Sequence, residues 1–265
     1  MTPRSYLFVP ADRSARYAKA LASGADAVIV DLEDAAAPDA KTNARDSLEA
    51  WLTGPDARGV VVRVNAAGTP WFEDDLRVVC RSPHVSAVML PKAERADDLA
   101  RITGKPLLAL IESAAGFDAL RAVAGAPGVE RLVFGSVDFQ LDLGIDGEGE
   151  ELLYFRSQLV LASRLHGLAP PVDGVSTAID DAAVLDADTR RARRLGFGAK
   201  LCIHPKQVDA VNRGFAPTAA EIAWAKRVLD AAASAGGAAF AVDGKMVDKP
   251  VLLRAEALLR QAGHG

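Results

Sequence analysis

The chain has 265 residues, of which 50% are hydrophobic, and a formal net charge of −4 at pH 7. This length suits one barrel-sized domain or two smaller ones, the charge argues against nucleic-acid binding, and two cysteines give neither a disulfide framework nor a zinc pattern. Because the first apolar run is too short for a signal peptide and no stretch could span a membrane, we expect a cytoplasmic protein.

Short apolar segments alternate with helical segments over residues 1–213, which predicts strand–helix units in series. Eight such units predict an α/β fold of the closed (β/α)8 type, a TIM barrel. A doubly wound open sheet is the alternative, but its glycine-rich first turn is absent. The predicted strands are Ser5–Pro10, Ala27–Leu32, Val60–Asn65, Ala87–Leu90, Leu107–Ser113, Leu132–Asp138, Pro171–Thr177 and Ala199–Ile203.

Two neighbouring predicted strands end at carboxylates, Glu112 and Asp138, with one helix expected between them at Ala114–Ala124. Parallel strands end at the same edge of a sheet, so these carboxylates are expected side by side. Close carboxylates repel, so one binds a proton or both share a cation. Oxygen ligands at an open mouth favour Mg²⁺ or Mn²⁺, with water and substrate completing the shell. The alternative is that each acid caps the following helix.

The turn before Asp138 is predicted to bind a carboxylate. Gly135, Ser136 and Val137 offer backbone N–H groups, and a glycine lets a ligand approach closely. After Asp138 we expect a loop rich in glycine and acids, at Asp142–Gly149.

Arg63 ends the third predicted strand and is expected at the same mouth. A guanidinium can hold a substrate carboxylate through two hydrogen bonds. The alternative is an ion pair within the barrel to Asp31, Glu33 or Asp34, and both roles can hold at once.

Further basic residues follow other predicted strands. Lys92 could form a Schiff base, but an ion pair with an acid such as Glu112 is favoured by the many nearby acids. Three basic residues recur at helical spacing, Arg13, Arg16 and Lys19. They form either a solvent-exposed face or a binding site for a phosphorylated part of a ligand. His204 is expected to be only a hydrogen-bonded strand terminus.

Residues 214–265 are expected to form a C-terminal helical extension with a lid. Thr218 and Glu221 form a capping box at the start of a helix. The segment Gly236–Pro250 mixes apolar and polar residues behind two glycines, which is typical of a lid or arm. The alternative is a hairpin packed on the barrel.

Seven segments, taken in order, resemble the citrate lyase beta-subunit-like proteins of the HpcH/HpaI aldolase and malyl-CoA or citramalyl-CoA lyase superfamily. The resemblance covers nearly the whole chain and implies a (β/α)8 barrel, a magnesium ion and, commonly, a homotrimer. It also implies cleavage or formation of a carbon–carbon bond beside an acyl thioester. The segments are Ser5–Pro10, Asp31–Asp34, Arg63–Asn65, Leu90–Glu94, Ile111–Ser113, Gly135–Asp138 and Gly244–Pro250.

By motif, the resemblance implies that Glu112 and Asp138 bind magnesium and that Arg63 contacts the substrate carboxylate. It implies that the arm covers a neighbouring subunit's mouth, where Asp248 is the acid/base. The implied substrate is a 3-hydroxyacyl-CoA such as malyl-, citramalyl- or hydroxymethylglutaryl-CoA, which would yield an acyl-CoA enolate and an oxo acid. Asp248 would protonate that enolate.

The basic residues Arg13, Arg16 and Lys19 could then hold the phosphates of CoA. No histidine precedes His84, which counts against the branch of pyruvate aldolases that uses an early histidine base. Two alternatives to a free-standing CoA-ester lyase remain. One is the beta subunit of a citrate lyase complex, acting on an acyl-carrier thioester. The other is a non-catalytic binding or regulatory relative, against which the retained site residues argue.

Overall fold

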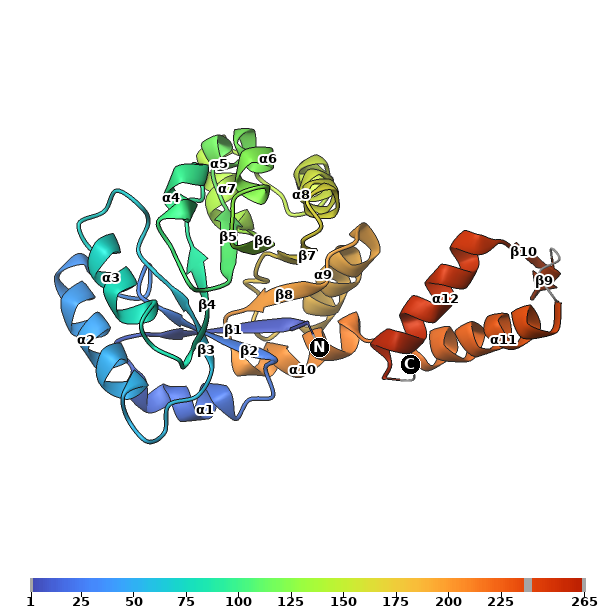
Figure 1. Cartoon of the computed structure of the whole chain (residues 1–265), viewed down its shortest axis with the longest axis horizontal. Helices are drawn as coiled ribbons and strands as arrows, with labels where there is room; N and C mark the ends of the chain where they lie inside the picture. Colours follow the sequence, from blue (N-terminus) through green and yellow to red (C-terminus); the bar gives the residue numbers. More distant parts are fainter. Residues whose placement is uncertain (1, 236–239, 264–265) are drawn as a thin grey trace. The chain divides into compact units, whose positions relative to one another are not determined.

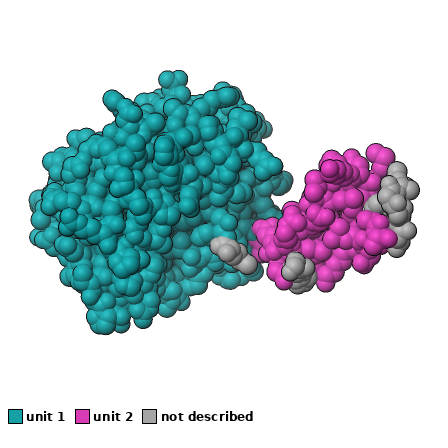
Figure 2. Space-filling view, viewed as in Figure 1, with its two compact units in different colours: residues 1–215 teal, residues 216–265 magenta. Residues whose placement is uncertain are grey.

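The structure, a computed structural model, describes residues 2–235 and 240–263. The chain divides into two compact units, the first ending at Phe215 and the second beginning at Ala216 (Figure 2). Among the described residues, no helix is both long and apolar enough to cross a membrane.

The first unit is a closed barrel of eight parallel strands in sequence order, with helices outside the strands (Figure 1). This confirms the predicted (β/α)8 fold. The barrel closes where Ser5 of the first strand pairs with Lys200 of the last. The strands are β1 (Ser5–Pro10), β2 (Ala27–Asp31), β3 (Val60–Arg63), β4 (Val85–Leu90), β5 (Leu107–Ile111), β6 (Val129–Phe134), β7 (Ala169–Asp173) and β8 (Ala199–Cys202).

Helices cover the outside of the barrel, and short 3-10 turns precede three of them, at Ser14–Arg16, Pro38–Ala40 and Glu150–Leu152. The helices are α1 (Tyr17–Leu21), α2 (Lys41–Leu52), α3 (Phe72–Val79), α4 (Ala96–Ala100), α5 (Ala114–Asp118), α6 (Leu120–Ala124), α7 (Ser136–Leu143), α8 (Leu153–Leu165), α9 (Ala182–Leu195) and α10 (Pro205–Phe215).

The strands are buried on both faces, so their side chains build two cores. On β2, Ile29 points into the barrel, where it belongs to a cluster with Tyr6 and Met89. Its neighbours Val28 and Val30 point outward and pack in the larger cluster between strands and helices. This two-sided burial explains why the strands read as near-continuous apolar runs.

Three predicted elements differ from the structure. Strand β6 ends at Phe134 and α7 begins at Ser136, so the expected strand to Asp138 is wrong, whereas the loop expected at Asp142–Gly149 is present after α7 ends at Leu143. The predicted helix at Ala114–Ala124 is two short helices, α5 and α6, that meet at Ala119.

The third difference is β7, which was predicted at Pro171–Thr177 but lies at Ala169–Asp173. Directly after the strand, Gly174 passes close to the start of α7. A Cβ on Gly174 would lie 2.4 Å from the Ser136 hydroxyl. The residues after Asp173 leave the sheet and contribute to the loops at the barrel mouth.

The second unit holds α11 (Ala219–Ala235), an antiparallel hairpin of β9 (Phe240–Val242) and β10 (Lys245–Val247), and α12 (Lys249–Gln261). The predicted capping box is confirmed, because the N–H of Thr218 donates to Glu221 Oε2 at 2.8 Å and the N–H of Glu221 donates to Thr218 Oγ1 at 3.2 Å. Of the predicted arm, residues 236–239 lie outside the described residues.

Candidate functional site

A cavity of about 410 Å³ opens at the carboxyl ends of the barrel strands. This is the end at which (β/α)8 enzymes carry their active sites. The cavity brings together a carboxylate from β5, an arginine from β3 and the start of α7. The predicted site residues that line it are Arg63, Glu112, Gly135, Ser136, Val137 and Asp138.

Glu112 follows β5 directly and only 3% of its surface is exposed. Its Oε1 accepts a hydrogen bond of 2.8 Å from the backbone N–H of Lys92. Lys92 has a φ of 45°, in the left-handed region that residues other than glycine rarely adopt. The barrel therefore holds Glu112 through the backbone of a strained residue, as functional sites often do.

The pKa of Glu112 is raised to about 8, chiefly by burial and also by the carboxylates of Glu33 and Asp138. The Lys92 N–H and Arg63 act in the opposite direction. Desolvation and neighbouring negative charges both disfavour the ionised form of a carboxylate, and for Glu112 desolvation is the larger cause. A bound divalent cation would favour the ionised form of Glu112 by compensating its negative charge.

Gly135 makes room for Glu112. A Cβ on this glycine would lie 2.5 Å from the Cβ of Glu112 and 2.7 Å from its Oε2. The N–H of Gly135 is not free for a ligand, contrary to our prediction, because it donates to the Ile111 carbonyl at 2.9 Å in the sheet. The role of this glycine is to let the acid stand beside α7.

Ser136, Val137 and Asp138 form the first turn of α7. The first N–H groups of a helix have no partner within it, and they favour an anion. Asp138 is exposed, and its charge reaches Glu112 strongly enough to raise the pKa of that group. The two acids that the sequence paired thus line one cavity. Glu112 is buried directly after the end of β5, and Asp138 is exposed in the first turn of α7.

Arg63 lies within a cluster of acids. Its Nε and Nη2 donate to the two oxygens of Asp31, both at 2.7 Å. Its Nη1 lies 2.9 Å from Glu33 Oε2, and its Nη2 lies 3.1 Å from Asp34 Oδ2. Burial would lower the pKa of Arg63, but these acids raise it above its ordinary value. The ion pairs expected as one alternative are therefore present.

Lys92 also pairs with this cluster, because its Nζ donates to Glu33 Oε1 at 3.2 Å. Burial lowers the pKa of Lys92, but Glu33 and Glu112 outweigh it, so the pKa lies above its ordinary value. A lysine held in its charged form is a poor nucleophile. The ion-pair role that the sequence favoured is the one the structure shows.

A buried polar network beside the mouth was missed by sequence reasoning. Arg156 of α8 binds both the Asp173 carboxylate at 2.8 Å and Glu148 Oε2 at 2.7 Å. Glu148 Oε1 in turn accepts from the Ser136 hydroxyl at 3.0 Å. The available signal was the position of Arg156 on the apolar face of its helix, four residues after Leu152 and three before Leu159.

The remaining predicted residues do not line the cavity. Arg13, Arg16 and Lys19 are exposed on the segment after β1, and Arg13 lies 3.9 Å from Asp12. Asp248 is exposed in the second unit, where it is the N-cap of α12, and its Oδ1 accepts from the N–H of Val251 at 3.2 Å.

The Glu112–Asp138 pair suits magnesium. Within the described ranges, no group of three or more His, Cys, Asp or Glu side chains could hold a metal ion. Magnesium needs no such group, because it keeps several waters and commonly takes one or two carboxylates together with substrate oxygens. The raised pKa of Glu112 and the shared cavity fit a site of this kind.

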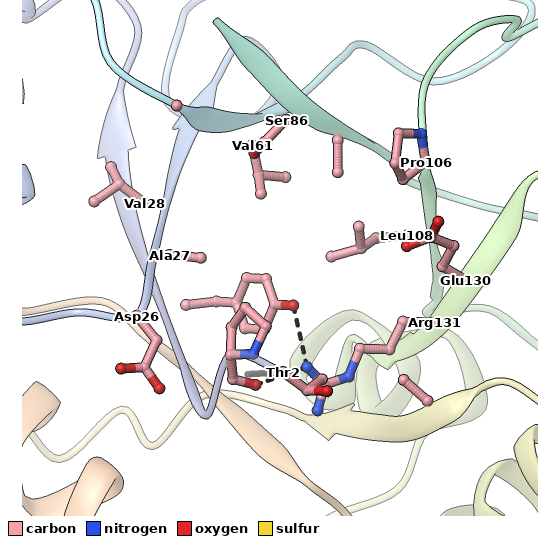
Figure 3. A pocket seen from close by; sticks show the side chains of 15 residues that line it. Thr2, Asp26, Ala27, Val28, Val61, Ser86, Pro106, Leu108, Glu130 and Arg131 are labelled. Atoms are coloured by element: carbon pink, nitrogen blue, oxygen red, sulfur yellow. Dashed lines mark hydrogen bonds between the residues drawn. The ribbon is translucent and has the colours of Figure 1, made fainter.

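A second cavity, of about 250 Å³, lies at the amino ends of the strands (Figure 3). Arg131 is buried there, and its Nη1 donates to the Pro3 carbonyl at 2.7 Å and to the Tyr6 hydroxyl at 3.1 Å. Burial lowers the pKa of Arg131. In barrels of this type that face contributes stability, so the mouth cavity is the candidate active site.

Comparison with known proteins gives consistent matches. Residues 4–205 match the family model described as HpcH/HpaI aldolase/citrate lyase. A citrate lyase subunit beta-like protein of Deinococcus radiodurans is 40% identical, covering 97% of this chain and 96% of the relative. A (3S)-malyl-CoA thioesterase of Cereibacter sphaeroides is 35% identical, with 98% and 94% covered. The crystal structure of CitE from Mycobacterium tuberculosis with magnesium, acetoacetate and coenzyme A matches with a TM-score of 0.88, 37% identity and 98% of both chains covered.

Proposed function

Because the chain belongs to the HpcH/HpaI aldolase/citrate lyase family, we propose that it is a magnesium-dependent carbon–carbon lyase acting on a 3-hydroxyacyl-CoA ester. Malyl-, citramalyl- and hydroxymethylglutaryl-CoA are the candidate substrates, each giving an acyl-CoA enolate and an oxo acid. The observation that carries the proposal is the pair of carboxylates, Glu112 and Asp138, at one mouth. The magnesium, acetoacetate and coenzyme A bound to the M. tuberculosis protein support it.

In this proposal Glu112 and Asp138 hold the magnesium ion. The bound ion supplies Lewis-acid polarisation of the oxo-acid carbonyl. The N–H groups of Ser136 and Val137, at the start of α7, bind the substrate carboxylate. This assignment replaces the expected contribution of the Gly135 N–H, which is used in the sheet.

Arg63 stabilises the negative charge on the 3-oxygen of the substrate, which becomes the carbonyl oxygen of the oxo acid when the adjacent carbon–carbon bond breaks. Its guanidinium already contacts three acids, of which Asp34 is the most exposed, with 64% of its side-chain surface open. Asp34 is therefore the partner that substrate displaces. Asp31 stays bound to two guanidinium nitrogens and keeps the arginine aimed at the cavity.

We further propose that the chain forms a homotrimer in which Asp248 reaches the mouth of a neighbouring subunit. There its carboxylate protonates the thioester enolate, or removes a proton from the acyl-CoA in the reverse direction. Support comes from its exposed position at the start of α12 and from relatives whose similarity extends over 97% and 98% of this chain. The exposed cations Arg13, Arg16 and Lys19 are the proposed contacts of the CoA phosphates.

The alternative is the beta subunit of a citrate lyase complex, which would act on an acyl-carrier thioester. It is supported by relatives named citrate lyase subunit beta and citrate lyase subunit beta-like protein. One assay separates the two functions. Purified protein with magnesium is incubated with each candidate CoA ester and with a citryl-acyl-carrier thioester, and the oxo acid formed is measured.

We expect turnover of a CoA ester that EDTA abolishes and added magnesium restores. The Glu112→Gln variant is the inactive control. Turnover of the acyl-carrier thioester alone would favour the complex subunit. Failure with every thioester, in protein shown to bind magnesium, would contradict the lyase proposal.

A further inference from the structure

We propose that Glu148, held by Arg156, is a positioning residue that fixes the first turn of α7 at the barrel mouth. The inference rests on the proposed function, because that turn carries Asp138 and the N–H groups assigned to the substrate. Glu148 itself touches neither metal nor substrate in this scheme. It acts through Ser136, the first residue of α7.

Both oxygens of Glu148 are engaged. Its Oε1 accepts from the Ser136 hydroxyl at 3.0 Å, and its Oε2 accepts from Arg156 Nη2 at 2.7 Å. Arg156 also binds the main chain at the same place, because its Nη1 donates to the Glu148 carbonyl at 2.8 Å. The loop residue is therefore fixed at both its backbone and its side chain.

Arg156 is itself anchored. Only 1% of its surface is exposed, and its Nε donates to Asp173 Oδ1 at the end of β7 at 2.8 Å. Its guanidinium lies 5.4 Å from the centre of the Phe134 ring on β6. The ends of two barrel strands thus locate Arg156, which locates Glu148. Charge-assisted hydrogen bonds of this kind hold a tighter geometry than neutral ones.

The start of α7 needs such a tether because its N-cap residue is Gly135, which has no side chain to cap the helix. The first residue of the helix is instead held from outside, because the Ser136 hydroxyl donates to Glu148. Its hydroxyl also lies against Gly174, where a Cβ would come within 2.4 Å of it. A shift of Ser136 would carry along Asp138, two residues further on the same turn.

The test compares Glu148→Gln with Glu150→Gln. Both variants remove one negative charge, from positions two residues apart, but Glu150 is exposed at the start of the 3-10 turn. Hydrogen exchange of residues 135–143 is measured in metal-free protein, and magnesium affinity is measured by titration calorimetry. We expect Glu148→Gln to speed exchange in this segment and to weaken magnesium binding about tenfold, as loss of an outer partner of a ligand commonly does. Glu150→Gln should match the wild type in both.

Ser136→Ala provides a second test, because it removes only the hydroxyl that donates to Glu148. If Glu148 acts through Ser136, this variant should also speed exchange, and the double variant should lose no more affinity than either single variant. Unchanged exchange in both Glu148→Gln and Ser136→Ala would overturn the inference. A wild-type protein that binds no magnesium would instead contradict the proposed function, while the metal-free exchange would still decide the role of Glu148.

Discussion

The two acids at the mouth occupy very different surroundings. Glu112 is buried beside Gly135 and bound by one backbone N–H, whereas Asp138 is exposed on a helix that begins at Ser136. Burial favours the uncharged form of Glu112. The pair therefore combines a buried acid that gives up its proton reluctantly with an acid that is exposed.

Magnesium binding should release a proton from Glu112 below about pH 8, because burial raises its pKa to about 8. Metal binding requires the ionised carboxylate, so affinity should rise about tenfold per pH unit as pH approaches that value. Calorimetry in two buffers with different ionisation enthalpies would count the released proton. An affinity that does not change between about pH 6 and pH 8 would contradict this assignment.

The same group sets a pH dependence of stability in metal-free protein. The folded pKa of Glu112 lies above its ordinary value of 4.5, so its stabilising contribution is complete below pH 4.5 and is lost as pH rises through about 8. Glu112→Gln mimics the protonated acid. Its Tm should exceed that of the wild type at about pH 9, and the difference should shrink towards pH 4.5. If the variant and the wild type have the same Tm at both pH values, Glu112 does not set this pH dependence.

Arg63 should not be replaceable by lysine. Its Nε and Nη2 bind both oxygens of Asp31, and a lysine cannot reproduce that fork. If Arg63 also stabilises the reacting oxygen, Arg63→Lys should lower kcat roughly a hundredfold. The check is steady-state kinetics on protein whose folding is verified by circular dichroism. Near-normal turnover would leave Arg63 as a structural ion-pair partner only.

At the scale of elements, the barrel was predictable and α7 was not. Apolar runs that end in polar residues indicate strands buried on both faces, and this pattern located the mouth and Glu112. Residues Ser136–Leu143, however, alternate apolar and polar side chains, which is the period of a strand. They form a helix because Phe139 is buried against Phe134 and Phe155, with ring centres 5.3 and 4.7 Å away.

The polar network around Glu148 shows a second limit of the sequence. Glu148 lies in a loop rich in acids, and nothing local distinguishes it from Glu150. Its partner Arg156 is eight residues away, and Asp173 is further still. Such pairs form only when β6, β7 and α8 are assembled, so spacing along the chain does not reveal them.

Asp248 should show separable effects on α12 and on activity. Its side chain caps the helix by accepting from Val251, and asparagine caps nearly as well as aspartate, whereas alanine does not. Asp248→Asn should therefore keep the wild-type Tm but lose activity, since an amide cannot exchange the proton. Asp248→Ala should lose activity and should also lower the free energy of unfolding by about 1 kcal/mol. An active Asp248→Asn variant would refute the acid/base role.

At the scale of the whole molecule, the barrel closes within residues 1–215 and carries the mouth, whereas Asp248 belongs to the second unit. The active site as proposed thus draws on both units. The question that follows is whether Asp248 serves the mouth of its own barrel or that of a neighbouring subunit.

Mixing subunits should answer it. Glu112→Gln and Asp248→Asn proteins, each inactive alone, are mixed under conditions that allow exchange. If the second unit serves a neighbouring barrel, some mixed oligomers pair an intact mouth with an intact Asp248, and part of the activity returns. Mass spectrometry confirms the exchange. Exchange without any return of activity would mean that Asp248 acts within its own chain or not at all.

The close approach of Gly135 to Glu112 also limits how this sequence can diverge. Every other amino acid adds a Cβ, and at position 135 that atom would overlap the acid at 2.5 Å. We therefore expect no amino-acid substitution at Gly135 to be neutral while Glu112 keeps its position. The two positions are expected to evolve together, with the glycine varying only in relatives that have also lost the acid.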